Sequence, residues 1–278
     1  MCLPVFSDRE VVMILVQSIS ASVSAAASGV GVKGDIESFF SGLWDSFEKT
    51  FIYQDRWRFF WNGLLATLRI AFFAAVFGIV LGFLVAAVRS TYEMHLRGKK
   101  CRNFGNFMMK FLNVICNIYI TIIRGTPAVI QVMIMYFIIF ANSRNKEFAA
   151  VLSFGINSGA YVAEIVRSGI MSVDKGQFEA SRSLGFNYPG TMFLIVFPQA
   201  FKNILPALGN EFIVLIKETS VAAYVGISEL TYVGNLVRSR TYEAFFPLIA
   251  VALIYLAIVL ILTFLLKKLE RRLRNSDR

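Results

Sequence analysis

Polar side chains that can bind a small molecule interrupt a run of sequence that is otherwise apolar enough to cross a bilayer. Asn157, Tyr161 and Glu164 are spaced by four and three residues, so they share one face of a helix, and Ser158 is adjacent. Ionisable groups are costly at membrane depth, which makes this face a candidate lining for a translocation path. The alternative is structural: Glu164 pairs with Arg167, and Asn157 hydrogen-bonds between helices. The sequence leaves both interpretations open.

A second polar group falls inside a later apolar run. Glu211, Lys217 and Glu218 interrupt it, and the last two begin the sequence KETS, residues 217–220. The pattern indicates a helix that breaks or turns within the membrane, where irregular backbone is tolerated only if it is buried in protein or lines a water-filled cavity. A polar network that orders the helices is the alternative.

A helix boundary is expected at the sequence RGTP, residues 124–127. The hydroxyl of Thr126 can cap a helix, and Pro127 suits the first helical position. Residues 107–123 are therefore expected to form a separate or kinked helical piece that leads into the second span.

Membrane helices must position these residues. The chain has 278 residues, of which 56% are hydrophobic and 17% charged, a composition typical of an integral membrane protein. We expect an all-α fold with five spans, at about 63–88, 107–141, 148–171, 204–225 and 244–266. In the first span small residues recur every four positions and should let another helix pack closely: Ala74, Gly78, Gly82 and Ala86.

The basic residues predict the orientation of the spans. Six Lys/Arg residues and one acid, Glu93, lie within residues 89–110, and six basic residues follow Leu266. Positive residues mark cytoplasmic loops. Five spans then place the N-terminus outside, and the C-terminus and the polar segment 172–203 in the cytoplasm. This bias accounts for the net charge of +10, and no aromatic-basic platform for nucleic acid accompanies it.

The start of the chain differs from the rest. Residues 1–55 are predicted to be an N-terminal extension, signal-like or disordered, and residues 56–278 a transmembrane domain. Residues 11–19 are apolar but too short to span a bilayer, and a run of small residues follows them.

No metal site or catalytic site is expected. His95 is the single histidine, and the three cysteines, Cys2, Cys101 and Cys116, form no paired motif. The sequence lacks a G-x-x-x-x-G-K-[ST] phosphate-binding loop and a nucleophile–base arrangement. We therefore expect neither an enzyme nor a nucleotide-binding subunit.

The segment 179–198 resembles the EAA motif of ATP-binding cassette importer permeases. That motif reads E-A-A, three residues, G, nine residues, I, two residues and P. The sequence EASRSLGFNYPGTMFLIVFP matches it at Glu179, Ala180, Gly185, Ile195 and Pro198, with Ser181 in place of the second alanine. Further segments resemble the polar amino acid (histidine, glutamine and arginine-type) permease branch: GLLATLRIA, RGTPAVIQ, NSGAYVAEIVRSGI, LIKETS and SELTY. The resemblance covers the chain from about Trp57 onward.

The resemblance implies a five-helix permease core like that of methionine and maltose importers, and it implies an ATPase partner. The residues that it assigns to coupling are Gly176, Glu179, Ala180, Ser181 and Gly185. Gly185 would permit a tight turn between two short helices, and Glu179, near a helix start, would cap it or pair with a basic partner. The helices would dock onto a dimer of cytoplasmic ATP-binding subunits. ATP and Mg would be used there, and this chain would bind no cofactor.

The resemblance also implies an amino acid uptake transporter in a bacterial-type plasma (inner) membrane. A second permease copy, identical or similar, would complete the path, and an extracytoplasmic binding protein would deliver the amino acid. Asn157, Ser158 and Tyr161 would bind the backbone groups of the substrate, and Glu164 would favour a cationic side chain. The remaining path candidates are Thr126, Gln131, Lys217, Glu218 and Thr219.

Two other classes of protein are alternatives. A secondary transporter or channel not coupled to ATP would need a coupling-ion site or inverted repeats, and five spans do not divide into equal halves. A membrane-embedded enzyme would need a catalytic site. ATP dependence of uptake distinguishes the permease from both.

Overall fold

The computed structural model describes residues 41–96, 103–143 and 145–275. Contacts divide the chain into two units, Met1–Gln54 and Asp55–Arg278. The described part of the first unit is helical over residues 41–47 and continues as a π-helix, η1 (Glu48–Ile52). The predicted signal-like segment lies outside the described residues.

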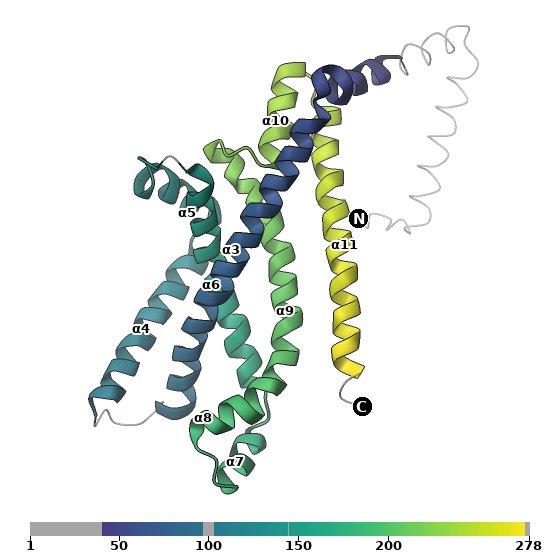
Figure 1. Ribbon diagram of the computed structural model, residues 1–278. Helices are drawn as coiled ribbons and strands as arrows, with labels where there is room; N and C mark the ends of the chain where they lie inside the picture. Colours follow the sequence, from purple (N-terminus) through teal and green to yellow (C-terminus); the bar gives the residue numbers. More distant parts are fainter. Residues whose placement is uncertain (1–40, 97–102, 144, 276–278) are drawn as a thin grey trace, which may run out of the picture. The chain divides into compact units, whose positions relative to one another are not determined.

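The second unit contains five helical segments long and apolar enough to cross a membrane: Trp57–Met94, Phe104–Gly125, Lys146–Met171, Tyr188–Val225 and Phe245–Leu273. They contain the helices α3 (Trp57–Thr91), α4 (Phe104–Gly125), α6 (Lys146–Met171), α9 (Phe197–Glu218) and α11 (Phe245–Asn275) (Figure 1). The described residues contain no strand. The predicted all-α fold with five spans is therefore confirmed.

The second expected span, 107–141, is two helices. α4 ends at Gly125, and α5 (Ala128–Ile134) follows after two extended residues and continues as the π-helix η4 (Met135–Ile139). The break falls there because Pro127 has no N–H and disfavours a helical conformation in the residue before it. Pro127 itself is the N-cap residue of α5. The expectation that Thr126 caps this helix is wrong, because its hydroxyl donates backward to the carbonyl of Ile122 at 2.9 Å.

The fourth helical run starts earlier than residue 204. It includes α8 (Tyr188–Thr191), the π-helix η5 (Met192–Val196), α9 and the 3₁₀ helix η6 (Thr219–Val225). Residues 192–197 are all apolar and extend the run toward the preceding loop. The segment 172–203 thus contains α7 (Lys175–Ser183), α8, η5 and the start of α9. The backbone changes from α to 3₁₀ after Glu218, at the break expected from the polar residues there.

The core of the second unit is the close packing of α3 on α6. Ala74 and Ala86 are fully buried, and Gly78 and Gly82 approach the backbone of α6. A Cβ atom on Gly78 would lie 3.1 Å from the carbonyl oxygen of Gly155, so neither helix can carry a larger side chain there without moving apart. The small-residue ridge predicted from the sequence is the contact surface for α6.

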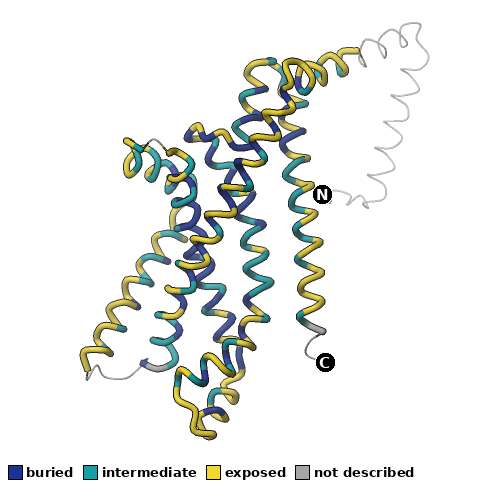
Figure 2. The backbone as a smooth tube through the Cα atoms, in the orientation of Figure 1, coloured by how far each residue is buried: buried dark blue, intermediate teal, exposed yellow. Residues whose placement is uncertain are grey.

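Burial is uneven among the spans (Figure 2). In α6, 67% of the apolar stretch is buried, against 11% in α4 and in α11. The outer faces of α4 and α11 are apolar and bare, as expected of helices that face lipid or another chain. α10 (Leu230–Thr241) lies at the opposite end of the second unit from α7 and α8 (Figure 1).

Candidate functional site

The segment between the third and fourth spans folds into two short helices. α7 begins after Asp174, whose carboxylate accepts a hydrogen bond from the backbone N–H of Gly176 at 2.6 Å. Glu179 lies in the middle of α7 and its side chain is exposed. The expectation that Glu179 caps the helix is wrong, because Asp174 is the N-cap residue and has the short side chain that this role needs.

A rigid turn ends α7. The N–H of Phe186 donates to the carbonyl of Ser181 at 3.1 Å, and the N–H of Gly185 donates to that of Arg182 at 3.0 Å. This pair of bonds is a Schellman motif, and Gly185 adopts its left-handed position with φ of +85°. Gly185 thus makes the tight turn expected from the sequence. Leu184, beside it, is 77% exposed although it lies outside the spans.

Ser181, which departs from the alanine of the EAA motif, joins the two short helices. Its side chain is buried, and its hydroxyl donates to the carbonyl of Phe178 at 2.9 Å. The same hydroxyl lies 3.1 Å from Oγ1 of Thr191 at the end of α8. Alanine there would leave the buried Thr191 hydroxyl without this partner.

α7 packs against the end of the first span. Phe178 contributes to a hydrophobic cluster that also contains Val166, Val173 and Met94. Met94 belongs to η3 (Tyr92–Leu96), the π-helix that continues α3. A cavity of about 420 Å³ lies between η3, α7 and α8, and its wall includes Glu93 and Arg182. α7, η3 and the end of α6 are therefore joined by one hydrophobic cluster and line one cavity.

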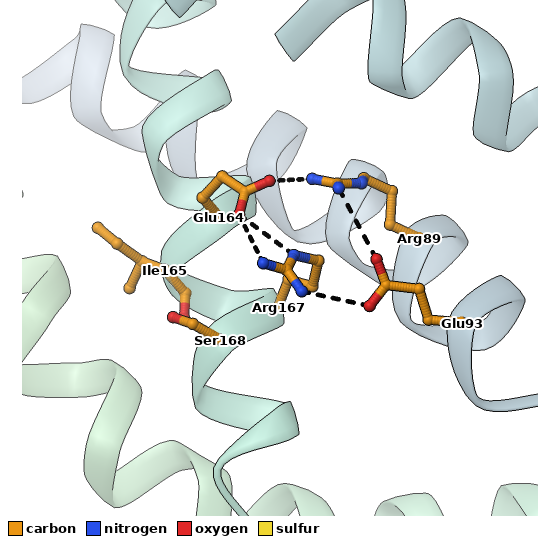
Figure 3. A network of polar contacts seen from close by, with 6 residues as sticks. All are labelled: Arg89, Glu93, Glu164, Ile165, Arg167 and Ser168. Carbon is orange, nitrogen blue, oxygen red and sulfur yellow. Dashed lines mark hydrogen bonds and ion pairs between the residues drawn. The ribbon is translucent and has the colours of Figure 1, made fainter. Parts of the chain in front are cut away.

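Glu164 is part of a closed set of four alternating charges, which we call the charge ring: Arg89, Glu93, Glu164 and Arg167 (Figure 3). Arg89 on α3 donates to one carboxylate oxygen of Glu164, and Arg167 donates to the other at 2.9 Å. Arg167 also contacts Glu93 at 3.2 Å, and Arg89 lies 3.8 Å from Glu93. The pairing of Glu164 with Arg167, one of the two interpretations of the sequence, is present.

Asn157 connects α6 to α5. Its Nδ2 donates to Oε1 of Gln131 at 2.9 Å. Nε2 of Gln131 donates in turn to Oγ1 of Thr126 at 2.8 Å and to the carbonyl of Ile123 at 2.7 Å. Asn157 is almost fully buried, so it holds the broken helix pair against α6. Thr126 and Gln131 line a cavity of about 250 Å³ whose other walls are mainly isoleucine and methionine.

Ser158 and Tyr161 contact groups that the sequence did not connect to them. The hydroxyl of Ser158 donates to Glu211 on α9 at 3.0 Å. The guanidinium of Arg124, at the end of α4, lies 5.1 Å from the ring centre of Tyr161, a cation–π distance. Glu211 is half-buried within a span, where an ionisable group is costly, which makes it a further candidate for the path.

The three path candidates at the end of α9 differ in how far they are buried. Thr219 is buried, and its hydroxyl donates to the carbonyl of Ile216 at 2.6 Å. Glu218 is partly buried and Lys217 is exposed. The structure thus joins Asn157 with Gln131 and Thr126, places Glu164 in a separate ion-pair network, and leaves Lys217 on an open face.

Glu229 lies in the segment SELTY and is a functional residue that the sequence alone did not predict. Glu229 is fully buried and caps α10, accepting hydrogen bonds from the N–H groups of Thr231 at 2.8 Å and Tyr232 at 2.6 Å. It also accepts one from the Tyr255 hydroxyl on α11 at 3.0 Å. Burial raises the pKa of Glu229, and the backbone hydrogen bonds oppose this effect only in part. An acid just before a helical pattern was the signal that could have found it.

Known proteins are similar to this chain in sequence. The family described as "Binding-protein-dependent transport system inner membrane component" matches residues 103–275. The arginine transport system permease protein ArtQ of Bacillus subtilis (strain 168) is 37% identical over 222 residues, which cover 79% of this chain and 94% of that protein. The glutamine transport system permease protein GlnP of Escherichia coli (strain K12) is 37% identical over 217 residues, 77% of this chain and 92% of that protein.

Solved structures share its fold. A crystal structure of an amino acid ABC transporter with histidines matches with a TM-score of 0.68 and 38% identity, and covers 77% of this chain and 94% of that one. The MetNI methionine ABC transporter in an inward-facing conformation matches with a TM-score of 0.67 over 79% of this chain and 98% of that one. At 18% identity, the second likeness concerns the fold alone.

Proposed function

Because this chain belongs to the family of binding-protein-dependent transport system inner membrane components, we propose that its α7–α8 segment couples it to a cytoplasmic ATP-binding subunit. The chain is the permease subunit of an amino acid ABC transporter, a multi-pass protein of the inner membrane. In the proposal, ATP with Mg is bound and hydrolysed by a dimer of the partner subunit. This chain supplies the path and transmits the motion.

One observation carries the proposal: a hydrogen-bonded, exposed turn joins two short helices, and α7 shares a hydrophobic cluster with η3 and α6. The Schellman motif fixes Leu184 in an exposed position outside the five candidate spans. Phe178, on the inner side of α7, contacts the cluster that contains Met94. A partner that grips the turn can therefore move the spans as rigid bodies.

The remaining parts of the proposal follow from the family. A second permease copy, identical or similar, covers the open face of α9, and an extracytoplasmic binding protein delivers the substrate. Relatives are named for arginine and glutamine transport, so a polar L-amino acid is the proposed substrate class. The N-terminus lies outside, and the C-terminus and α7 lie in the cytoplasm. Asn157, Ser158 and Tyr161 form the proposed contact with the substrate, and Ser158 also donates a hydrogen bond to Glu211.

Two substitutions at one position test the coupling. Gly185 has open space around its Cα but a φ of +85°, so the backbone conformation and not the room decides what is tolerated. Asparagine accepts this region more readily than a β-branched residue does. We expect Gly185→Asn to retain the co-purifying ATPase subunit and Gly185→Val to lose it, while both remain in the membrane. Equal retention by both, or no ATPase with the wild type, would contradict the proposal.

A further inference from the structure

The charge ring is closed and neutral. Each of its two arginines contacts both of its two carboxylates, so positive and negative charges alternate around it (Figure 3). Its side chains are between 12% and 25% exposed, too buried to be treated as ordinary surface ion pairs. Two members come from α3 and η3, and two come from α6.

The ring stands between the coupling helices and the proposed path. Glu93 lies in the wall of the cavity beside α7, and the next residue, Met94, packs in the same cluster as Phe178. On the other side of the ring, Glu164 is on the same continuous helix as Ser158. Every ring contact that leaves α6 ends on Arg89 or Glu93.

Stability alone does not account for such a ring. Largely buried ion pairs pay a desolvation penalty that roughly cancels their attraction. Apolar side chains of similar volume often stabilise the folded state equally well. What charges add is a defined register, since each contact is directional and is lost when the helices slide apart. The packing of small residues in the middle of α3 and α6 supplies close approach but few directional contacts.

We propose that Arg89 and Glu93 are positioning residues that transmit the movement of α7 and η3 to α6 through Glu164 and Arg167 during ATP-driven transport. The inference rests on the proposed function and adds to it the side chains that carry the coupling inside this chain. ATP hydrolysis at the partner then moves η3, and the ring moves α6 with it. Without the ring, hydrolysis continues but α6 follows the movement of η3 less completely.

The test compares two ion pairs that join the same helices. Arg89→Gln/Glu164→Gln removes the contact between α3 and α6 in the ring and leaves the net charge of the ring at zero. The matched control is Arg69→Gln/Glu147→Gln, which removes a 2.6 Å pair between α3 and α6 near the opposite end of α6, with side chains 56% and 42% exposed. Each complex is purified with its ATPase subunit and reconstituted in vesicles containing ATP. A mixture of radiolabelled L-amino acids and an extracytoplasmic extract of the native host are supplied outside.

The measured quantity is amino acid moved per ATP hydrolysed. We expect this ratio to fall by at least about fivefold in Arg89→Gln/Glu164→Gln, the lower end of ordinary coupling between sites. In the control it should change by less than about twofold, as for an exposed pair. The single substitution Arg89→Lys, which keeps the charge, should retain most of the wild-type ratio. An unchanged ratio in Arg89→Gln/Glu164→Gln would overturn the inference.

Assembly is scored separately. If Arg89→Gln/Glu164→Gln does not retain the ATPase subunit, Glu93→Gln/Arg167→Gln applies the same test to the ring contact that joins η3 to α6. Loss of assembly in both would assign the ring to folding and overturn the inference. A wild-type complex that holds no ATPase, or that moves no amino acid with ATP, fails at the proposed function itself, which the wild-type measurement distinguishes from failure of the ring.

Discussion

Arg167 and Glu164 lie one turn apart on α6, and the guanidinium of Arg167 donates two hydrogen bonds, of 2.9 and 3.1 Å, to one carboxylate oxygen of Glu164. The other oxygen accepts from Arg89. Both oxygens of Glu164 are thus occupied by arginines of this chain, which leaves little capacity for a cationic substrate. Two hypotheses from the sequence, a structural ion pair and a substrate contact, therefore make different predictions.

Glu164→Gln should leave the relative preference among amino acids unchanged and lower the overall transport rate. The amide keeps the size of the side chain but removes a charge that two guanidinium groups share. The ion pairs of the ring are therefore weakened, while the substrate contacts in the path are unchanged. Competition of unlabelled amino acids against labelled uptake checks this. A selective loss of arginine and lysine uptake would instead restore Glu164 to the substrate site.

Gly82→Leu should prevent correct packing of α3 on α6. A Cβ on Gly82 would lie 2.9 Å from the carbonyl oxygen of Gly159, a backbone atom that cannot rotate away. Overpacking of this kind costs about 1–3 kcal/mol. The melting temperature of the protein in detergent should fall, whereas Gly125→Ala, at a position with nothing within 4 Å, should change it little. Equal melting temperatures for the two variants would contradict the close approach.

Leu184→Asp should weaken binding of the ATPase subunit by at least about tenfold, because a buried leucine contributes about 1.5–3 kcal/mol. The side chain of Leu184 is exposed when this chain is considered without partners, and it lies outside the spans. Ser183→Asp adds the same charge one residue earlier, where the hydroxyl donates to the carbonyl of Glu179, and serves as the control. Titration of the purified ATPase subunit onto the permease measures both. Similar affinities would remove Leu184 from the interface.

The stability of the α10 end should depend on pH through Glu229. Burial raises its pKa, so the folded state holds the proton more tightly than the unfolded state does. Stability is therefore greatest below the unfolded value, about 4.3, and falls as pH rises from there to the raised value. Glu229→Gln should remove this dependence, because the amide does not titrate.

Melting temperatures across pH measure this effect, with the exposed Glu270→Gln as the control. A wild type whose melting temperature rises across the same window would contradict the direction of the shift.

Features set by local chemistry were predictable from the sequence. Apolar runs located five spans, the repeat of Ala74, Gly78, Gly82 and Ala86 located the contact with α6, and Gly185 located the turn. Each depends on residue type and short-range spacing alone.

Long-range pairing was not predictable in the same way. Arg89 and Glu164 are 75 residues apart in the sequence. From the sequence, Arg89 was interpreted as part of a basic loop. The bond from Asn157 to Gln131 required the break at Pro127 to turn α5 back on α6. The predicted capping role of Glu179 was wrong because the motif gives only its position in the sequence. The helix begins after Asp174, which is the N-cap residue.

The energy source of uptake tests the central claim most directly. Vesicles with the purified complex are loaded with ATP, with a non-hydrolysable analogue, or with neither under an imposed proton or sodium gradient. Labelled L-amino acid uptake is then followed with the binding-protein extract outside. The account predicts accumulation only with hydrolysable ATP. Accumulation driven by an ion gradient in the absence of ATP would contradict it.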